Sequence, residues 1–344
     1  MKFKAYQILL PIAIGFGVIA WLFFREFDPE EWRRMSLTDY AAWGVVLAVL
    51  AVIGRDFGLT WRFHHLSDSD LTWRQSLRVC LLCEFTSAVT PTAVGGSAFS
   101  LYFMSKEGLS LGRSTTLMMT TLFFDELIFV VLCPIVVAIV PYSELLCIGQ
   151  PGLEWLPATF WIVYAVIFIW TAVLFVGIVV KPSIVTSLIN YLFRLPFIRR
   201  WRRSAEKLCH DMMTTSEDLH NKQFGWWAKG FAATAASWIS RFLVVNAILI
   251  IFIPAADHLL VLCRQFAVWL VLMFAPTPGG SGLSEGLFMT YYGDIITTES
   301  AALAVTVVWR LFSYYLYLAI GAILLPSWFS RNATKHDEAA PVNS

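Results

Sequence analysis

GGSAFS at residues 95–100 and GGSGLS at residues 279–284 are two nearly identical glycine motifs in one chain. Each lies in very apolar sequence directly after a proline-containing segment, TPTAV at 90–94 and APTP at 275–278. Proline removes a backbone donor and clashes with the preceding helical turn, so neither segment forms one continuous helix. The same break therefore occurs twice in one chain, and this predicts an internal repeat.

The composition is that of a membrane protein. Hydrophobic residues make up 58% of the 344 residues and charged residues only 14%, with a mean hydropathy of +0.67. Soluble domains are closer to about 45–50% apolar and about 25% charged. We therefore predict an all-α polytopic membrane protein that forms a single membrane domain over residues 1–344. No soluble domain suggests a nucleic-acid partner.

Six apolar runs are long enough to cross a bilayer core of about 30 Å. We predict crossings at about 6–24, 40–57, 115–140, 158–180, 228–253 and 300–325. Two further apolar segments, 77–105 and 259–293, contain the glycine breaks. Pieces of about 10–12 residues form helices of only about 15–18 Å, roughly half the bilayer core. Each broken segment is therefore predicted to be a re-entrant helical hairpin.

The distribution of Lys and Arg orients the chain, because short cytoplasmic loops are enriched in both. The strongly basic loop 181–226 is assigned to the cytoplasm, and the loop 141–157, which has no Lys or Arg, to the outside. The segment after the second crossing is assigned to the cytoplasm because of its arginines, Arg55, Arg62, Arg74 and Arg78. These assignments, with both termini in the cytoplasm, agree only if each hairpin returns to its own side. We predict a multi-pass protein of the cytoplasmic (inner) membrane.

The two hairpins then belong to units of opposite orientation. One unit spans about 40–140 and the other about 228–325, each with a crossing, a hairpin and a second crossing. Inverted repeats whose discontinuous helices meet near the bilayer midplane are typical of transporters. The alternative is that Gly-Gly-Ser is a helix-packing motif, since small residues let membrane helices approach closely.

Six charged residues lie deep in these apolar segments, where charge is costly and usually functional or paired. They are Glu84, Asp125, Glu126, Arg241, Glu285 and Arg310. Glu126 follows Gly95 by 31 residues, and Arg310 follows Gly279 by 31 residues, so an acid and a base occupy equivalent positions. We hypothesise that Asp125 and Glu126 share the interior with Arg310, as an ion pair or a polar gate. A static structural salt bridge is the alternative.

The hairpin tips have the chemistry of an anion site. Helices that begin at the glycines would point their N-terminal amides at the midplane, and such amides suit a phosphate. The geometry equally suits a carboxylate or plain packing. Arg241 is a further candidate for phosphate contact. The predicted substrate-binding residues at the tips are Gly95, Gly96, Ser97, Gly279, Gly280 and Ser281.

Other polar features are weaker. Cys80 and Cys83 have the spacing of a redox or metal pair, but no second pair or histidine lies nearby, which favours small packing residues. We predict no metal and no cofactor, and no GxxxxGK[ST] motif implies ATP. The basic, amphipathic loop 181–226 is typical of contact with anionic lipid, or of the ordinary positive-inside signal. Its predicted lipid-surface contacts are Arg199, Arg200, Arg202 and Arg203.

The sequence around both breaks resembles a known family. Pro91, Gly95-Gly96, KEGLSLGRS at 106–114 and FDE at 124–126 look like the first conserved block of the lysylphosphatidylglycerol synthase transmembrane (flippase-type) family. PTPGGSGLSE at 276–285 and RLFSYY at 310–315 look like its second block. The resemblance covers about residues 6–330 and implies a multi-spanning bacterial or archaeal membrane protein.

The best understood members of that family move aminoacylated phosphatidylglycerol between leaflets, and others are associated with isoprenoid-lipid, hopanoid or glycolipid pathways. This chain has Asp125-Glu126 where the family usually has Asp-Arg, so the charge there is reversed. The chain ends after its last crossing, without the soluble aminoacyl-transferring domain of the full-length synthases. The resemblance therefore gives no reason to predict lysyl transfer.

Three functions are compatible with these features. The leading prediction is a flippase-like lipid translocase that binds membrane lipids with an anionic head group. The first alternative is a membrane enzyme or accessory subunit acting on an isoprenoid or glycolipid, although no catalytic motif is visible. The second is an ion-coupled exporter of small solutes. The loop 181–226 could also host a partner lipid-modifying enzyme.

Overall fold

A computed structural model describes residues 38–90, 94–180, 217–273, 275, 277, 279–296 and 298–338. These residues are helical, with turns and no strand. Five helical stretches are long and apolar enough to cross a membrane: 41–66, 111–139, 156–178, 224–252 and 300–328. They correspond to five of the six predicted crossings, and the sixth, 6–24, lies outside the described residues. The all-α polytopic fold is therefore confirmed.

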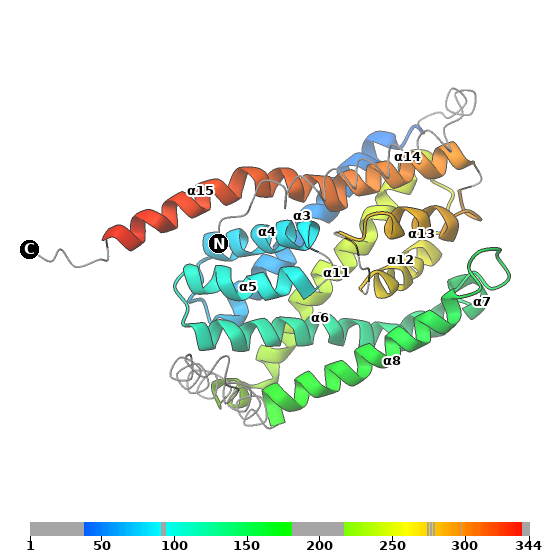
Figure 1. Cartoon of the computed structure of the whole chain (residues 1–344). Helices are drawn as coiled ribbons and strands as arrows, with labels where there is room; N and C mark the ends of the chain where they lie inside the picture. Colours follow the sequence, from blue (N-terminus) through cyan, green and yellow to red (C-terminus); the bar gives the residue numbers. More distant parts are fainter. Residues whose placement is uncertain are drawn as a thin grey trace, which may run out of the picture.

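The elements follow the predicted order of long crossings interrupted by pairs of shorter helices (Figure 1). They are α3 (Ala41–Leu66), α4 (Trp73–Val89), α5 (Val94–Lys106), α6 (Leu111–Ile139), α7 (Tyr142–Leu145), α8 (Leu156–Phe175), the π-helical turn η1 (Val176–Val180), α11 (Phe224–Phe252), α12 (His258–Leu272), α13 (Leu283–Tyr291), α14 (Glu299–Arg310), the π-helical turn η3 (Leu311–Tyr315) and α15 (Leu316–Glu338).

Helices α4 and α5 form the first hairpin. A capping box starts α4, in which the Thr72 side chain accepts from the Gln75 amide and Gln75 accepts from the Thr72 amide. At this same open end of the hairpin, Gln75 Nε2 donates to the Glu107 carbonyl at 2.9 Å, and Arg78 binds the Glu107 carboxylate with both Nε and Nη2. The start of α4 and the end of α5 are therefore adjacent, and the chain returns to the end from which it came.

Helices α12 and α13 form the second hairpin in the same way. Arg264 on α12 is buried and donates to the Tyr291 carbonyl and to both carboxylate oxygens of Asp294, which follows α13. Gln265 Nε2 also donates to the Tyr292 hydroxyl at 2.9 Å. The hairpin helices are less uniform than expected: α4 has 17 residues, about 25 Å of helix, whereas α13 has only 9.

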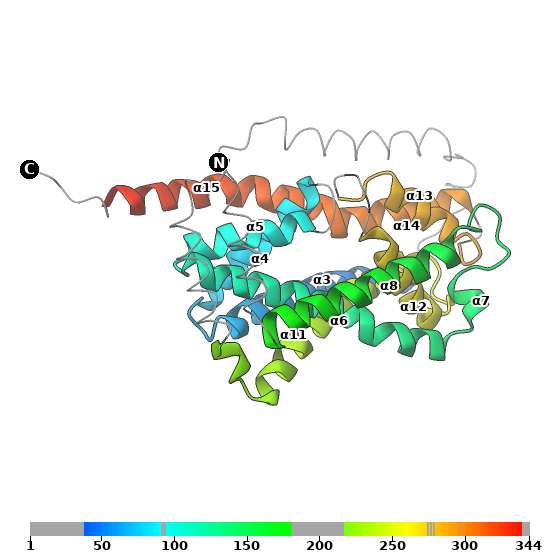
Figure 2. The same ribbon diagram turned by 60° about the horizontal axis from the view of Figure 1, so that its bottom comes forward.

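The two hairpins enter the bundle from opposite ends because α3 and α11 are antiparallel. A Cβ on Gly44, at the start of α3, would lie 2.8 Å from the Ala247 carbonyl near the end of α11, and Gly58 faces Ser237 further back. Each hairpin follows the C-terminal end of one of these two helices. Figures 1 and 2 show the hairpins at opposite ends of the molecule. An inverted repeat predicts this arrangement, and the equivalence of 40–140 with 228–325 stays a prediction.

Close contact between α3 and α11 makes a strong prediction for Gly58. An added Cβ would lie 2.7 Å from the Ser237 amide nitrogen and 2.8 Å from the Ala233 carbonyl, and backbone cannot move aside cheaply. We expect Gly58→Ala to lower the free energy of unfolding by about 1–3 kcal/mol through overpacking. Gly225→Ala on the same helix pair is the matched control, since a Cβ there meets nothing within 4 Å. Equal thermal unfolding temperatures in detergent for the two variants would contradict this close helix contact.

The ion pair at the base of the first hairpin predicts a pH-dependent contribution to stability. Burial raises the pKa of Glu107, but hydrogen bonds from Arg78 and Trp328 outweigh it and hold that pKa below its usual range. A lowered carboxyl pKa contributes stability above the unfolded-state value of about 4.3, and this is lost as the pH falls through the folded pKa. We expect Glu107→Gln to lower the unfolding temperature at pH 7, with the difference from wild type shrinking below about pH 4. A difference that is constant with pH would show that the carboxylate charge contributes nothing.

Membrane orientation and the inner-membrane location stay predictions. The lipid-surface residues Arg199, Arg200, Arg202 and Arg203 lie outside the described residues. In the described part of their loop, Lys222 Nζ binds the Asp68 carboxylate at 2.8 Å. Arg113, near the start of α6, binds Asp70 in the same turn region after α3.

Candidate functional site

The tips of the two hairpins meet inside the bundle. A Cβ added to Gly279 would lie 3.2 Å from the Ala88 carbonyl on the last turn of α4, and 2.2 Å from the Tyr314 ring of η3. Gly279 and Gly280 have positive φ values of +57° and +69°. The second tip therefore requires glycine both for its backbone conformation and for the space at this contact.

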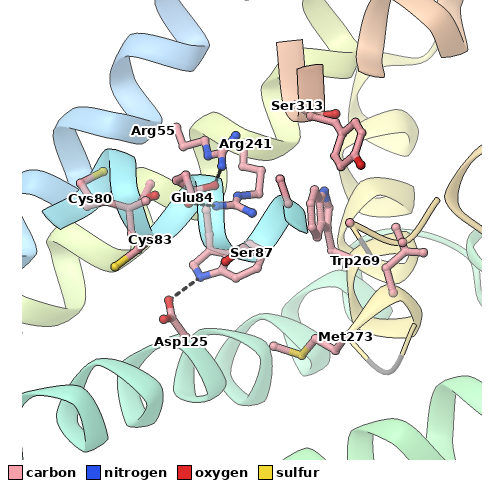
Figure 3. A pocket seen from close by; sticks show the side chains of 18 of the residues that line it. Arg55, Cys80, Cys83, Glu84, Ser87, Asp125, Arg241, Trp269, Met273 and Ser313 are labelled. Atoms are coloured by element: carbon pink, nitrogen blue, oxygen red, sulfur yellow. Dashed lines mark hydrogen bonds and ion pairs between the residues drawn. The ribbon is translucent and has the colours of Figure 1, made fainter. Parts of the chain in front are cut away.

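A cavity of about 200 Å³ lies where the tips meet. Its walls come from α3, α4, α6, α11, α12 and α14, so both halves of the chain contribute (Figure 3). Apolar side chains and several hydroxyls line much of it. The charged side chains on its walls are Arg55, Arg62, Glu84, Asp125, Glu126, Arg241 and Arg310.

Two arginines converge on one carboxylate on the upper wall in Figure 3. Arg55 of α3 contacts Glu84 Oε2, and Arg241 of α11 binds Glu84 Oε1 at 2.9 Å. The Arg241 guanidinium also lies 4.7 Å from the Trp238 ring and 4.9 Å from the Trp269 ring, which hold it by cation–π contact. This arginine pair carries one positive charge more than its shared carboxylate.

A second ion pair lies on the wall formed by α6. Arg62 of α3 binds Asp125 with both guanidinium nitrogens, at 2.6 and 3.1 Å. Trp238 Nε1 donates to the same carboxylate at 2.9 Å. Bidentate pairs of this kind are strong and geometrically specific. Asp125 is therefore fully engaged by groups of the protein itself.

Arg310 fastens the second hairpin tip. Its Nε lies 2.7 Å from Glu285 Oε1, Nη1 donates to the Gly279 carbonyl at 3.1 Å, and Nη2 donates to Ser281 Oγ at 3.1 Å. Glu285 Oε2 accepts from the Gly282 amide at 2.7 Å and from Ser284 Oγ. Directly after Arg310 the helix changes to the π-helical turn η3, a feature often found at functional sites.

Glu126 differs from every other carboxylate in the cavity. It takes part in no ion pair within the described part of the chain, and its Oε2 is buried without a hydrogen-bond partner there. Arg62, which also lines the cavity, pairs with the neighbouring Asp125 instead. Glu126 is thus a carboxylate on the cavity wall to which no described arginine is paired.

Comparison with known proteins shows which family this chain belongs to. A sequence profile of the lysylphosphatidylglycerol synthase TM region matches residues 8–321. The chain belongs to this family. It is also 23% identical over 345 residues to a UPF0104 membrane protein from Archaeoglobus fulgidus, covering 94% of this chain and 99% of the relative. No solved structure matches the chain significantly.

In this member of the lysylphosphatidylglycerol synthase TM family, the hypothesis of direct pairing between Arg310 and Asp125 or Glu126 is wrong. Arg310 binds Glu285, and Asp125 binds Arg62. All three predicted residues nevertheless line one cavity, as the equivalent spacing from the glycine breaks suggested. The spacing predicted a shared location correctly, but it could not predict which side chains reach each other.

The structure also alters the predicted anion site at the N-termini of the hairpin helices, because some of its groups are already bound within the protein. At the second tip, Glu285 already accepts from the Gly282 amide, and Ser281 Oγ accepts from Arg310, so these groups are satisfied internally. Gly279 and Gly280 remain on the cavity wall. Gly95, Gly96 and Ser97 lie in the first turn of α5, and the surroundings of their side-chain positions lie outside the described residues.

Two arginines of the site were missed by the charge-distribution argument. Arg55 and Arg62 were assigned to a cytoplasmic segment, but α3 continues to Leu66 and both are 3% exposed inside the bundle. Their spacing of seven residues, two helical turns, places them on one face and was the signal available. Cys80 and Cys83 also line the cavity as free thiols, and no group of three metal-ligating residues exists within the described part of the chain.

Proposed function

We propose that this protein moves a lipid with an anionic, phosphate-bearing head group between the membrane leaflets. The observation that carries the proposal is the arginine-rich cavity between the tips of two oppositely inserted hairpins. Arg55 and Arg241 share one carboxylate, which leaves a positive charge for the head group. Arginine is well suited to phosphate because its planar donors match phosphate geometry.

The size of the cavity supports a head group as its occupant. Pockets for drug-sized ligands enclose about 300–1,000 Å³, and this cavity encloses about 200 Å³. A lipid therefore places only its polar end inside, while its acyl chains stay in the bilayer. In this proposal, the cavity removes the main barrier to translocation, which is the cost of moving a charge through hydrocarbon.

In the proposed transport cycle, the ion pairs are the contacts that form and break as the hairpins move. Arg310 holds the second tip through Gly279, Ser281 and Glu285, so that tip can move only with loss of these contacts. The Arg62–Asp125 pair joins α3 to α6 across the cavity. Alternating access then consists of one hairpin separating from the opposite half around the head group, as inverted-repeat transporters do.

A liposome assay tests the proposal directly. Purified protein is reconstituted with trace acyl-labelled fluorescent phosphatidylglycerol, and dithionite quenching reports how fast inner-leaflet lipid reaches the outside. We expect Arg241→Gln to slow translocation about tenfold or more, because a charge-assisted contact worth at least about 1.4 kcal/mol is lost from the moving state. Arg74→Gln, the same change at an exposed arginine on α4, is the matched control and retains the wild-type rate.

The assay separates a specific cavity from nonspecific leakage. Equal rates for wild type and both variants would contradict passage through the cavity, even if lipid moves. An absence of movement for every phospholipid tested, with folded protein in the vesicles, would contradict phospholipid translocation. Phosphatidylcholine in parallel vesicles reports the dependence on net head-group charge.

A further inference from the structure

The charges around the cavity sum to zero only when every carboxylate is ionised, and one of those carboxylates has no ion-pair partner among the described residues. Four arginines, Arg55, Arg62, Arg241 and Arg310, face three carboxylates that pair with them, Glu84, Asp125 and Glu285. The fourth carboxylate, Glu126, pairs with none of them among the described residues. Glu126 is half-buried, and its Oε2 is shielded from solvent without a partner among the described residues. An unpaired carboxylate in such a place is costly to keep charged, and such groups neutralise by taking up a proton.

The other charged groups on the cavity wall already have ion-pair partners. On its own helix, Asp125 is charged and bound to Arg62 of α3. On α11, Trp238 donates to Asp125, and Arg241 is committed to Glu84 of α4. The other lining side chains with polar atoms, given helix by helix, are Cys80, Cys83 and Ser87 on α4, Ser100 on α5, Thr121 on α6, Ser237 on α11, Trp269 on α12, Thr277 in the second tip, Trp309 on α14, and Ser313 and Tyr314 on η3. Asp56 on α3 faces elsewhere, accepting from the Tyr317 hydroxyl at 2.7 Å.

With Glu126 protonated, the charged groups of the cavity and their ion-pair partners carry one net positive charge. With Glu126 ionised, they carry none. An anionic head group therefore gains attraction when Glu126 holds a proton and loses it when the proton leaves. Binding of the anion and binding of the proton must each favour the other, because such coupling is reciprocal.

We propose that Glu126 is a proton-binding site that couples proton uptake to binding of the anionic head group, so that one proton travels with each lipid. This deepens the proposed function and rests on it for the transported lipid, but not for the coupled binding. The cavity is electrically balanced when loaded with both a proton and a monoanionic phosphate diester. It is also balanced when it holds neither. The cavity can therefore change from one membrane side to the other, empty or loaded, without carrying net charge.

The test measures translocation and binding separately as functions of pH. Translocation of short-chain fluorescent phosphatidylglycerol is followed from pH 5.5 to 8.5 by extraction with albumin, which tolerates this range. Wild-type translocation is expected to fall about tenfold for each pH unit above the midpoint, the slope of a one-proton linkage. Glu126→Gln, which cannot ionise, loses this slope. Glu217→Gln, the same change at an exposed carboxylate, keeps it.

Binding is measured in detergent as thermal stabilisation by dioleoyl-phosphatidylglycerol over the same pH range. Tighter binding at low pH in wild type, without pH dependence in Glu126→Gln, supports the coupling even if no lipid crosses the bilayer. Coupled binding without any lipid movement would overturn the proposed translocation but not the proton site. Pyranine, a pH-sensitive dye trapped inside the vesicles, should report that the vesicle interior becomes more acidic as labelled lipid moves inward. Translocation or binding with the same pH slope in wild type and Glu126→Gln would overturn the proton site and leave the translocase intact.

Discussion

Replacing Arg310 by methionine is expected to lower the free energy of unfolding by about 3–5 kcal/mol, one of the two largest effects of any single change in the cavity. The substitution keeps an unbranched side chain but removes the contacts to Gly279, Ser281 and Glu285. Glu285 is 0% exposed and would be left as a buried charge without its cation. Titration with sodium dodecyl sulfate from mixed micelles measures the change.

A double-mutant cycle identifies the partner of Arg310. Glu285→Gln together with Arg310→Met should recover at least about 2 kcal/mol relative to the sum of the single changes, since the orphaned charge is gone. Glu126→Gln with Arg310→Met should show a much smaller coupling, because these two residues make no ion pair. The reverse ranking of the two coupling energies would contradict the arrangement at the second tip.

Glu84→Gln is the second change with a large expected effect. It leaves Arg55 and Arg241, which are 3% and 14% exposed at their side chains, as neighbouring positive charges without their shared carboxylate. We expect a loss of about 3–5 kcal/mol in the free energy of unfolding. An anionic ligand would restore the missing charge, so phosphatidylglycerol should stabilise this variant more than it stabilises the wild type.

Thermal unfolding with graded phosphatidylglycerol and phosphatidylcholine checks both parts of this expectation. Glu84→Asp is the matched control, since it keeps the charge on a shorter side chain and should lie between wild type and Glu84→Gln. If phosphatidylglycerol stabilised Glu84→Gln no more than it does the wild type, the excess positive charge would not be the head-group site.

The long helices and both hairpins could be predicted because each leaves a local signal. Apolar runs of about 20 residues define crossings, and the prolines before Gly95 and Gly279 define the breaks. The antiparallel return of each hairpin followed from the charge distribution alone. The extension of α3 to Leu66 could not be predicted, because arginines such as Arg55 and Arg62 normally mark the end of a crossing.

The pairing within the site could not be predicted for a different reason. The spacing of Glu126 and Arg310 from the glycine breaks placed both on one cavity, but ion-pair partners depend on the crossing of α3, α6 and α11 in space. Asp125 binds an arginine 63 positions earlier, and Glu84 binds one 157 positions later. Such contacts between distant positions carry no local sequence signal. Glu285 and Arg310 are only 25 positions apart, and the glycine break between α12 and α13 brings them together.

The position of a bound lipid phosphate would show whether the arginine-lined cavity is a head-group site. An experimental structure of the protein in nanodiscs containing phosphatidylglycerol would show whether a phosphate occupies the cavity. We predict phosphate density within about 2.7–3.2 Å of guanidinium nitrogens of Arg55 or Arg241, with the acyl chains directed out of the cavity. A cavity that holds no phosphate under these conditions, with the lipid phosphates confined to the two membrane surfaces, would contradict the head-group site.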